Sequence, residues 1–428
     1  MNEPPMQVDL ASPAFKDDPM PTWRRLQAAG DVVRVRLPLL GRVALATRRD
    51  AARRVFEDAD AFSLDARRAG RRARAGTEWW VPPGFRRLAD NLLVREGAEH
   101  RALRRRVEVA FRRPALEALQ ARIDERTERC LDAFEAARKR AAGTPAHDFV
   151  AEVARPLPMG VIGDLLGLDP EESAPHRPLG RALARLSGVG GALDLLRLTP
   201  ALGTITGVLR RELAARRARP TDDLLGALAA AIEDGDDGRD GDPFDQRAAV
   251  SMVFLLYVAG HETTVHLLSG ATLELLRRPE AREALPARPD AAAVGELMRW
   301  LSPVQFAKPR FVVRDVELAG TRLARGSTVA PLVGAANADD RAFERPEALD
   351  FSRPPARHLG FGAGPHVCLG LQLALRETET VLGRLFERFP RLALADPAAM
   401  PDWNRRPGLR ALGSLPLVPD RGAAVRSG

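Results

Sequence analysis

Cysteine is scarce in this chain, whose 428 residues include only Cys130 and Cys368 and no C-x-x-C pair. Zinc sites draw on several cysteine or histidine ligands at short spacings, so a zinc centre is disfavoured. A long chain with two cysteines suits a reducing compartment. The first residues, MNEPPMQVDL, lack the charged and then apolar pattern of a secretory signal. We therefore expect a cytoplasmic protein.

Long hydrophobic runs are also missing. The most apolar stretch covers residues 248–268, and its uncharged part covers only residues 248–260, whereas a membrane-spanning helix needs about 20 residues. We expect a buried core helix there and no membrane span. The net charge of +8 comes from 65 Lys and Arg against 57 Asp and Glu. The arginines are dispersed and no nucleic-acid motif accompanies them, so we expect acidic protein partners and no nucleic acid.

Signals that start and stop helices dominate the sequence. Apolar-periodic stretches that begin near proline or end near glycine cover residues 101–140, 149–167 and 220–234. Strand-like alternation is confined to residues 32–46 and 311–323. The pattern, without internal repeats, predicts a mainly α fold with a small β region. We expect a single catalytic domain over residues 13–418, with flexible tails at 1–12 and 419–428.

The most informative segment is FGAGPHVCLG, residues 361–370, in which Phe361, Gly364, Cys368 and Gly370 have the spacing F-x-x-G-x-x-x-C-x-G. Glycines at 362, 364 and 370 would allow tight turns, because they have no Cβ. Residues 371–386 read as a helix whose positive end would lie near the cysteine sulfur. A lone cysteine is more often a small buried apolar residue. A phosphate-binding loop is excluded, since a valine follows where the third glycine would stand.

Two further motifs precede this loop. Ala259-Gly260-His261-Glu262-Thr263-Thr264 lies in the apolar run, where an acid and a hydroxyl are costly unless something uses them. A helix kink with Thr263 bonded to a backbone carbonyl is the alternative. Glu296 and Arg299 in Glu-Leu-Met-Arg share one helix face. On its own this pair would be an ordinary surface ion pair worth ~0–1 kcal/mol.

Together the three motifs resemble those of the cytochrome P450 family, and their residues are most similar to those of its soluble bacterial members. The resemblance implies the cytochrome P450 fold, a helical triangular prism, and a haem b whose iron is bound by Cys368. It implies that Ala259 and Gly260 leave room for dioxygen, and that Glu262 and Thr263 deliver protons to it. Arg353 would join Glu296 and Arg299 in a buried structural network.

The resemblance also implies partners for the two haem propionates. Arg310, His366, His100 and Arg104 match the family's positions for this role, and Phe361, Gly362 and Gly370 complete the cofactor-binding loop. The substrate pocket is expected to draw on Trp79, Trp80, Leu255, Val258, Val304 and Phe306. Seven arginines surround the two tryptophans, at positions 67, 68, 71, 72, 74, 86 and 87. They either receive an acidic substrate group or form a solvated basic loop.

The function that follows from the resemblance is a haem-thiolate monooxygenase. We expect it to hydroxylate or epoxidise a small, mostly apolar molecule. Its electrons would come from NAD(P)H through a separate ferredoxin or flavodoxin and its reductase, and we expect a monomer. A peroxide-driven or rearranging haem-thiolate enzyme is one alternative, and a haem sensor or electron carrier is another. The acid and threonine of the second motif argue against the first alternative, and its small residues argue against the second.

Overall fold

The computed structural model describes residues 6–37, 41–71, 88–140, 146–168, 176–186, 199–232, 244–355 and 357–419. The predicted class is confirmed, since helices dominate and the strands form small sheets. The α-helices are α1 (Pro13–Asp17), α2 (Met20–Ala29), α3 (Arg49–Glu57), α5 (Gly97–Glu108), α6 (Arg113–Arg140), α7 (Pro156–Leu166), α8 (Arg177–Leu186), α10 (Thr199–Ala218), α11 (Leu224–Ala230), α12 (Gln246–Arg277), α13 (Pro279–Ala284), α14 (Ala291–Leu301), α15 (Val333–Asn337) and α16 (Leu371–Arg388).

Short 3₁₀ turns are η1 (Val109–Phe111) and η3 (Gly364–His366), and η2 (Val150–Ala154) is a π-helical turn. The strands are β1 (Met6–Gln7), β2 (Val32–Leu37), β3 (Gly41–Ala46), β4 (Phe62–Ser63), β5 (His147–Asp148), β6 (Arg310–Val312), β7 (Val316–Leu318), β8 (Thr321–Leu323), β9 (Thr328–Pro331), β10 (Leu392–Leu394) and β11 (Pro416–Pro419). Within the described residues the largest sheet has the order β1-β2-β3-β9-β6-β4. β2 and β3 pair antiparallel, from Val32 opposite Ala46 to Leu37 opposite Gly41.

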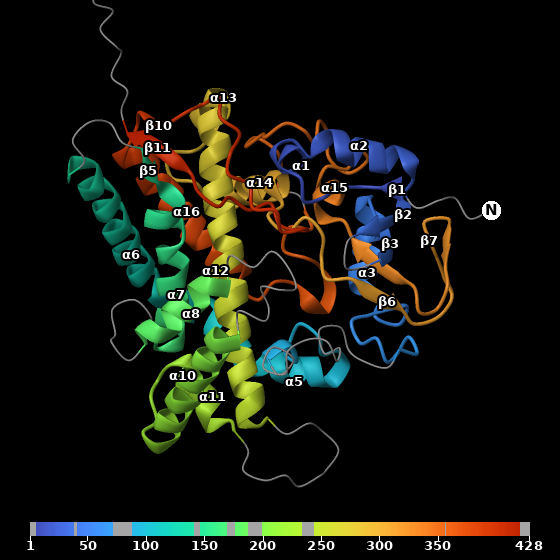
Figure 1. Ribbon diagram of the computed structural model, residues 1–428, viewed down its shortest axis with the longest axis horizontal. Helices are drawn as coiled ribbons and strands as arrows, with labels where there is room; N and C mark the ends of the chain where they lie inside the picture. Colours follow the sequence, from blue (N-terminus) through green and yellow to red (C-terminus); the bar gives the residue numbers. More distant parts are fainter. Residues whose placement is uncertain are drawn as a thin grey trace, which may run out of the picture.

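The central element is α12, which runs from top to bottom through the molecule in Figure 1, across its longest axis. Its first turn is capped by Asp245, whose carboxylate accepts a hydrogen bond from the Ala248 amide at 2.7 Å. Helices α7, α10, α14 and α16 pack against it. By length and composition α12 could cross a membrane, but 67% of its apolar window is buried inside the protein. The apolar run is therefore the core helix that the sequence predicts, extended at both ends.

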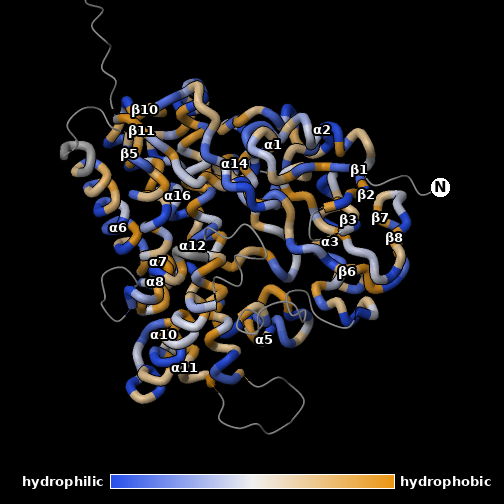
Figure 2. The backbone as a smooth tube through the Cα atoms, viewed as in Figure 1, coloured by the Kyte–Doolittle hydropathy of each residue, from blue (hydrophilic) through white to orange (hydrophobic). Residues whose placement is uncertain are grey.

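Helix α6 illustrates how the outer helices are built. Hydrophobic and hydrophilic residues alternate along it in Figure 2. Leu116, Ile123 and Leu131 are buried, and α6 contacts α7 and α16 through this stripe. The carboxylates of Glu128 and Glu135 on its outer turns pair with arginines of α16. The helix therefore closes one side of the core around α12.

Within the tail expected over residues 1–12, the described part, residues 6–12, packs on the folded domain. β1 pairs in parallel with β2, Met6 opposite Val35, and Val8 and Leu10 are buried. So short a segment does not reveal its partner strand, which begins about 25 residues further along. At the other end Pro419 belongs to β11, and residues 1–5 and 420–428 lie outside the described chain.

A buried network of ion pairs joins α14 to a later loop. It consists of Glu296 and Arg299 on α14 and of Arg353. Both oxygens of Glu296 accept hydrogen bonds from Arg299 at 2.7 Å, and Arg353 donates to one of them at 3.3 Å. Arg299 also donates to the carbonyls of residues 337, 346 and 348, each at 2.9 Å. Its side chain is only 2% exposed. Arg299 therefore ties α14 to two loops that lead to the Cys368 segment.

Replacing Arg299 should greatly lower the stability of the fold. Arg299→Ala leaves the buried Glu296 carboxylate short of its main cation and three carbonyls without a donor, a defect that costs about 3–5 kcal/mol. We expect little folded protein and a lower denaturation midpoint. Arg24→Ala is the matched control, because Arg24 pairs with Glu347 at 3.5 Å but is 66% exposed, and such pairs contribute about 0–1 kcal/mol. Equal stability of the two variants would contradict the role given to Arg299.

Glu377 on α16 is a second buried carboxyl, and neither of its oxygens has a hydrogen-bond partner among the described residues. Burial raises its pKa from 4.5 to about 8. The folded protein therefore keeps this group neutral at neutral pH, while the unfolded chain releases the proton. Because only the unfolded state gains from ionisation, the carboxyl lowers stability progressively as pH rises from about 4.5 to 8.

Glu377→Gln should remove this pH dependence. Relative to wild type, the free energy of unfolding of the variant should increase between pH 5 and pH 8, by about 1.4 kcal/mol per pH unit at most. Urea denaturation of both proteins at the two pH values measures the difference. Glu117→Gln is the control, since Glu117 is exposed and its pKa is lowered by Arg113. A Glu377→Gln difference that stays constant with pH would show that the carboxyl is ionised in the fold.

Candidate active site

The Cys368 loop is shaped by two glycines with left-handed backbones, Gly362 at φ 73° and Gly364 at φ 68°. A Cβ at Gly364 would lie 2.8 Å from the Phe56 carbonyl oxygen, so only glycine fits against α3. The Cys368 amide donates to the Phe361 carbonyl at 2.9 Å and closes the loop. The left-handed backbone explains the glycine at position 362, and the close approach to Phe56 explains in addition the glycine at position 364.

Gly370 has a different role from the one expected. Its φ of −84° is open to any residue, and a Cβ there would only touch Phe111 at 3.9 Å. It stands at the N-cap of α16, and its backbone N–H lowers the pKa of Cys368 by hydrogen bonding to the sulfur. The positive end of α16 points the same way. Gly370 therefore supplies a donor to the thiolate rather than a turn.

The surroundings of Cys368 describe an internal recess. The residue is exposed, yet desolvation by the surrounding protein raises its pKa, against the opposing effects of Gly370 and Arg104. A sulfur that is open on one side and surrounded by protein on the others lies in a recess. Among the described residues no three His, Cys, Asp or Glu side chains are grouped to hold a metal ion.

Cationic and imidazole donors gather beside this recess. Arg310 is 4% exposed, its guanidinium lies 5.0 Å over the Phe56 ring, and burial lowers its pKa to about 10. The rings of His100 and His366 lie 4.2 Å apart. Burial lowers the pKa of both, to about 3 for His366, so both are neutral at pH 7. The Nε2 atom of His100 is buried without a partner in the described chain.

Arg104 is turned to the loop itself. Its guanidinium donates to the carbonyl oxygens of Val367 at 2.9 Å and Pro365 at 3.1 Å. It therefore joins α5 to the cysteine loop and adds positive charge near the sulfur. A buried arginine with no ion pair among the described residues, two neutral imidazoles and the Cys368 thiol fit haem, whose two propionates need donors and whose iron takes a protein ligand.

Ala259 is the exposed residue of the motif on α12, although most of that helix is buried. Gly260 faces elsewhere, since a Cβ there would lie 2.6 Å from Ile162 Cδ1 on α7. The small size of Gly260 therefore allows α7 to pack on α12, and Ala259 is the exposed member of the pair.

The two polar residues of the motif have partners in the structure. The Thr263 hydroxyl donates to the Ala259 carbonyl at 2.8 Å, which is the backbone bond considered from the sequence, although α12 continues as one helix. Glu262 forms an ion pair with Arg406. Sequence reasoning missed Arg406, because it lies in an irregular segment 144 residues away and belongs to no motif.

The expected substrate residues that the structure describes lie on α12 and in the segment that follows α14. Leu255 and Val258 are on α12, Leu255 buried and Val258 half-buried. Val304 bridges Leu409, which brings the segment after α14 beside the segment before β11. Phe306 packs on this second segment at Gly408, where a Cβ would lie 2.7 Å from its ring. Trp79 and Trp80 lie outside the described residues.

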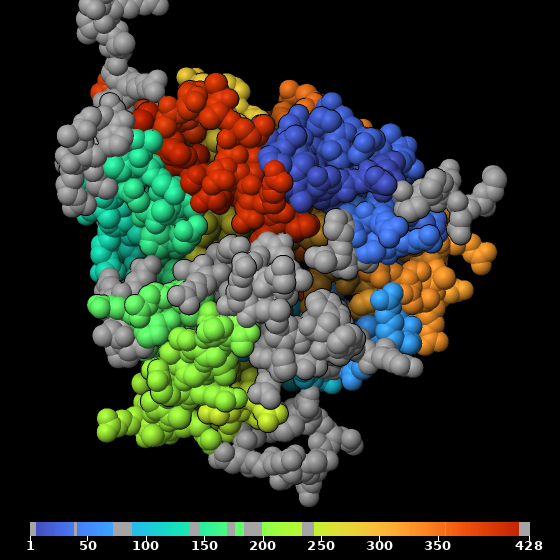
Figure 3. Space-filling view, viewed as in Figure 1, coloured from blue at the N-terminus to red at the C-terminus, as the bar shows by residue number. Residues whose placement is uncertain are grey.

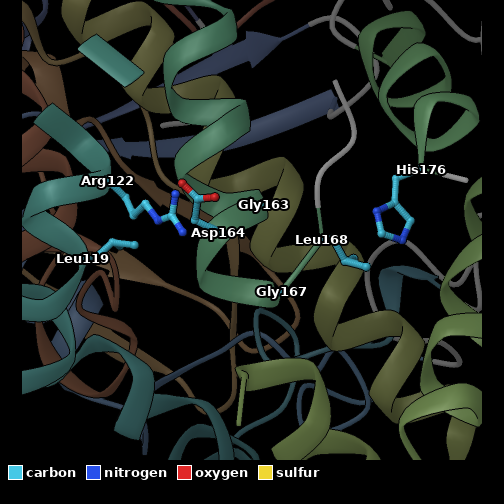
Figure 4. A pocket seen from close by; sticks show the side chains of 7 residues that line it. All are labelled: Leu119, Arg122, Gly163, Asp164, Gly167, Leu168 and His176. Atoms are coloured by element: carbon cyan, nitrogen blue, oxygen red, sulfur yellow. The ribbon is translucent and has the colours of Figure 1, made fainter. Parts of the chain in front are cut away.

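A surface pocket of about 430 Å³ lies between α6 and α7. Figure 4 shows Arg122 of α6 and Asp164 of α7 facing one another across it, with His176 on the far side. Asp164 already binds Arg126 through two hydrogen bonds of 2.5 and 2.7 Å. None of the predicted site residues lines this pocket, so it is separate from the recess at Cys368.

Known proteins resemble the chain along most of its length. The sequence model of the family "Cytochrome P450" matches residues 291–409. The cytochrome P450 monooxygenase PikC of Streptomyces venezuelae is 32% identical over 98% of this chain and 95% of its own. Nocardicin C N-oxygenase of Nocardia uniformis subsp. tsuyamanensis is 33% identical over 96% and 99%. The polyketide biosynthesis cytochrome P450 PksS of Bacillus subtilis is 34% identical over 77% and 78%.

Solved structures agree with these relatives. The structure of PksS has a TM-score of 0.81 at 30% identity and covers 97% of this chain and 100% of its own. The myxobacterial cytochrome P450 CYP267B1 in complex with myristic acid has a TM-score of 0.82 at 30% identity, with coverage of 96% and 99%. The three motifs, the donors around Cys368 and these similarities lead to one conclusion: the chain belongs to the cytochrome P450 family, and it is a haem-thiolate monooxygenase.

Proposed function

We propose that this enzyme inserts one oxygen atom of O₂ into a small, mostly apolar molecule, by hydroxylation or epoxidation, in the cytoplasm and as a monomer. The observation that carries the proposal is the recess at Cys368, where a lone thiol receives the Gly370 N–H and lies near Arg104. When bound, haem supplies the redox chemistry that activates dioxygen. The other steps depend on residues of the chain.

The chain's own residues would hold the haem and the substrate. Arg310 would bind one propionate as a buried cation, and the unpartnered Nε2 of His100 would donate to a propionate, with His366 beside it. Leu255, Val258, Val304 and Phe306 would supply apolar walls for the substrate. The relatives have names tied to polyketide synthesis, biotin synthesis and N-oxygenation, and they point to no single substrate.

Electrons would come from NAD(P)H through a ferredoxin or flavodoxin and its reductase. Four exposed arginines support an acidic partner near the cysteine loop: Arg101 and Arg105 on α5, and Arg112 and Arg113 at the start of α6. Arg104 of the same helix α5 contacts the carbonyls of the loop. A partner bound to this surface would therefore lie close to the thiolate.

The overall proposal is tested by turnover. Compound libraries are screened for spectral shifts on binding, and each hit is incubated with a surrogate ferredoxin, reductase and NAD(P)H under ¹⁸O₂. We expect one labelled oxygen atom in the product. Product formed only with hydrogen peroxide would favour the peroxide-driven alternative, and binding without any product would favour a sensor.

Cys368 should be the iron ligand. Reduced wild-type protein with carbon monoxide should show the red-shifted Soret band of thiolate ligation, and Cys368→Ala should lose it. Cys130→Ala is the control, because Cys130 lies on α6 and packs against the core; it should keep the band. Retention of the band in Cys368→Ala would contradict the assignment.

Thr263 should couple electron use to product formation. A group that transfers a proton has to lie within hydrogen-bond reach of its partner, directly or through one water. Thr263→Ala should bind haem and substrate normally but release more of its reducing equivalents as hydrogen peroxide. Glu262→Gln should mainly slow turnover, since an amide cannot cycle a proton. The measurement is the ratio of product to NAD(P)H consumed.

Thr264→Ala is the matched control for Thr263. The Thr264 hydroxyl makes the same kind of bond, to the Gly260 carbonyl at 3.0 Å, but the residue is buried. Loss of that bond should leave the product ratio unchanged. If Thr263→Ala and Thr264→Ala have the same ratio as wild type, Thr263 has no part in proton delivery.

A further inference from the structure

Glu262 lies in a group of charged and titratable side chains drawn from four parts of the chain. The other members are His261 and His266 on α12, Arg406 before β11, Lys16 on α1 and Arg155 before α7. We call these six residues the Glu262 cluster. Arg406, Lys16 and Arg155 are the basic members with a high intrinsic pKa, the two histidines can also be protonated, and Glu262 supplies the carboxylate.

Arg406 is the residue that binds Glu262 directly. Its Nη1 donates to Oε1 of the carboxylate, and both side chains are largely shielded, with 28% and 14% of their surfaces exposed. Burial raises the pKa of Glu262, and Arg406 opposes it through charge and hydrogen bonding. The arginine therefore keeps the carboxyl more acidic than its buried position alone would allow.

The histidines of the cluster do not compete for this carboxylate. His266 lies one turn beyond Glu262, and both of its ring nitrogens are buried without partners in the described chain. Burial, and then Arg406, lower its pKa to about 3. His261 is neutral for a similar reason, with a pKa of about 4. At neutral pH the positive charge that acts on Glu262 is thus that of Arg406.

The backbone that carries Arg406 is held by Lys16. The Lys16 ammonium is fully buried and donates to the carbonyl of Arg406 at 2.8 Å and to that of Asn404. The Asn404 side chain in turn accepts from the Arg406 amide at 3.0 Å. Figure 3 shows the N-terminal segment in blue against the C-terminal segment in red. Helix α1 therefore fixes the segment from which Arg406 reaches α12.

The same segment borders the expected substrate pocket. The Gly408 carbonyl accepts from the Gln305 amide, and the Arg410 amide donates to the Pro303 carbonyl, both at 2.8 Å. A change in the position of Arg406 would thus be transmitted to the residues beside Val304 and Phe306. This contact links the charge on Glu262 to the pocket wall.

We propose that Arg406 is the positioning residue of Glu262: it holds the carboxylate ionised and fixed beside α12, and Lys16 acts through it by fixing its backbone. The inference rests on the proposed function, in which Glu262 carries protons during dioxygen reduction. A carboxylate bound to a guanidinium takes up a proton only as that bond loosens. The ion pair therefore sets the pH range in which protons are delivered.

An infrared titration tests the positioning role without turnover. The carboxyl band of Glu262 is identified by its loss in Glu262→Gln and followed against pH in the haem-loaded protein. In Arg406→Gln the midpoint should rise by about 1–3 units, the range set by an adjacent opposite charge. Arg406→Lys keeps a cation and should stay nearer wild type. Arg405→Gln removes an exposed charge from the same segment and should leave the midpoint unchanged.

Turnover tests the link to function. The ratio of product to NAD(P)H consumed is measured against pH, and its alkaline limit should move upward in Arg406→Gln. Lys16→Met should move it in the same direction by less, and the double variant should move no further than Arg406→Gln. If Arg406→Gln does not fold, Lys16→Met and Arg406→Lys decide the outcome by the same readouts.

The outcomes separate the two proposals. An unchanged Glu262 midpoint in Arg406→Gln would overturn the positioning role whatever the activity. A shifted midpoint with an unchanged product ratio at every pH would show that Arg406 holds Glu262 but that Glu262 delivers no proton, which overturns the functional link. A wild-type protein that forms no product with any electron donor would instead refute the proposed function, and the infrared result would stand by itself.

Discussion

The ionisation of the Cys368 sulfur is the constraint on which the centre of the fold depends. Burial raises the pKa of this thiol, and within the described residues the Gly370 N–H and the charge of Arg104 oppose that rise. Both groups arrive from other elements: Gly370 opens α16, and Arg104 extends from α5 to the carbonyls of the loop. The loop can meet them because Gly364 fits against the backbone of α3. Bound iron would complete the ionisation, since a coordinating thiol is deprotonated.

Arginine and lysine side chains hold much of the remaining structure through backbone carbonyls. Arg299 ties α14 to three carbonyls, and Arg410 joins the C-terminal segment to the carbonyls of residues 16 and 17. Lys16 makes the reciprocal connection to residues 404 and 406. A guanidinium offers five donors in a fixed plane and can satisfy several acceptors at once. Part of the excess positive charge therefore serves connections inside the protein.

The sequence was sufficient wherever a function needs residues close together in the chain. The cysteine loop, the small residues and acid on α12, and the pair Glu296 and Arg299 are local patterns, and the fold class follows from helical periodicity. Contacts between distant segments left no such pattern. The ion pair of Glu262 joins residues 144 positions apart, and the pairing of β1 depends on strand order rather than on its own composition. The missing Cβ of Gly260 could be assigned to packing only when Ile162 was seen beside it.

One turn of α12 shows how a single helix meets several demands. Ala259 and Thr263 are four residues apart and share one face, which is partly exposed within an otherwise buried helix. Gly260, rotated by about 100° from Ala259, meets α7. Glu262 and His266 share a third direction, where Arg406 binds the acid. Residues adjacent in sequence thus lie on a partly exposed side, in the packed core and in a charged cluster. In the proposed function, a proton carried by Glu262 would cross from the third face to the first, a step of one residue along the helix.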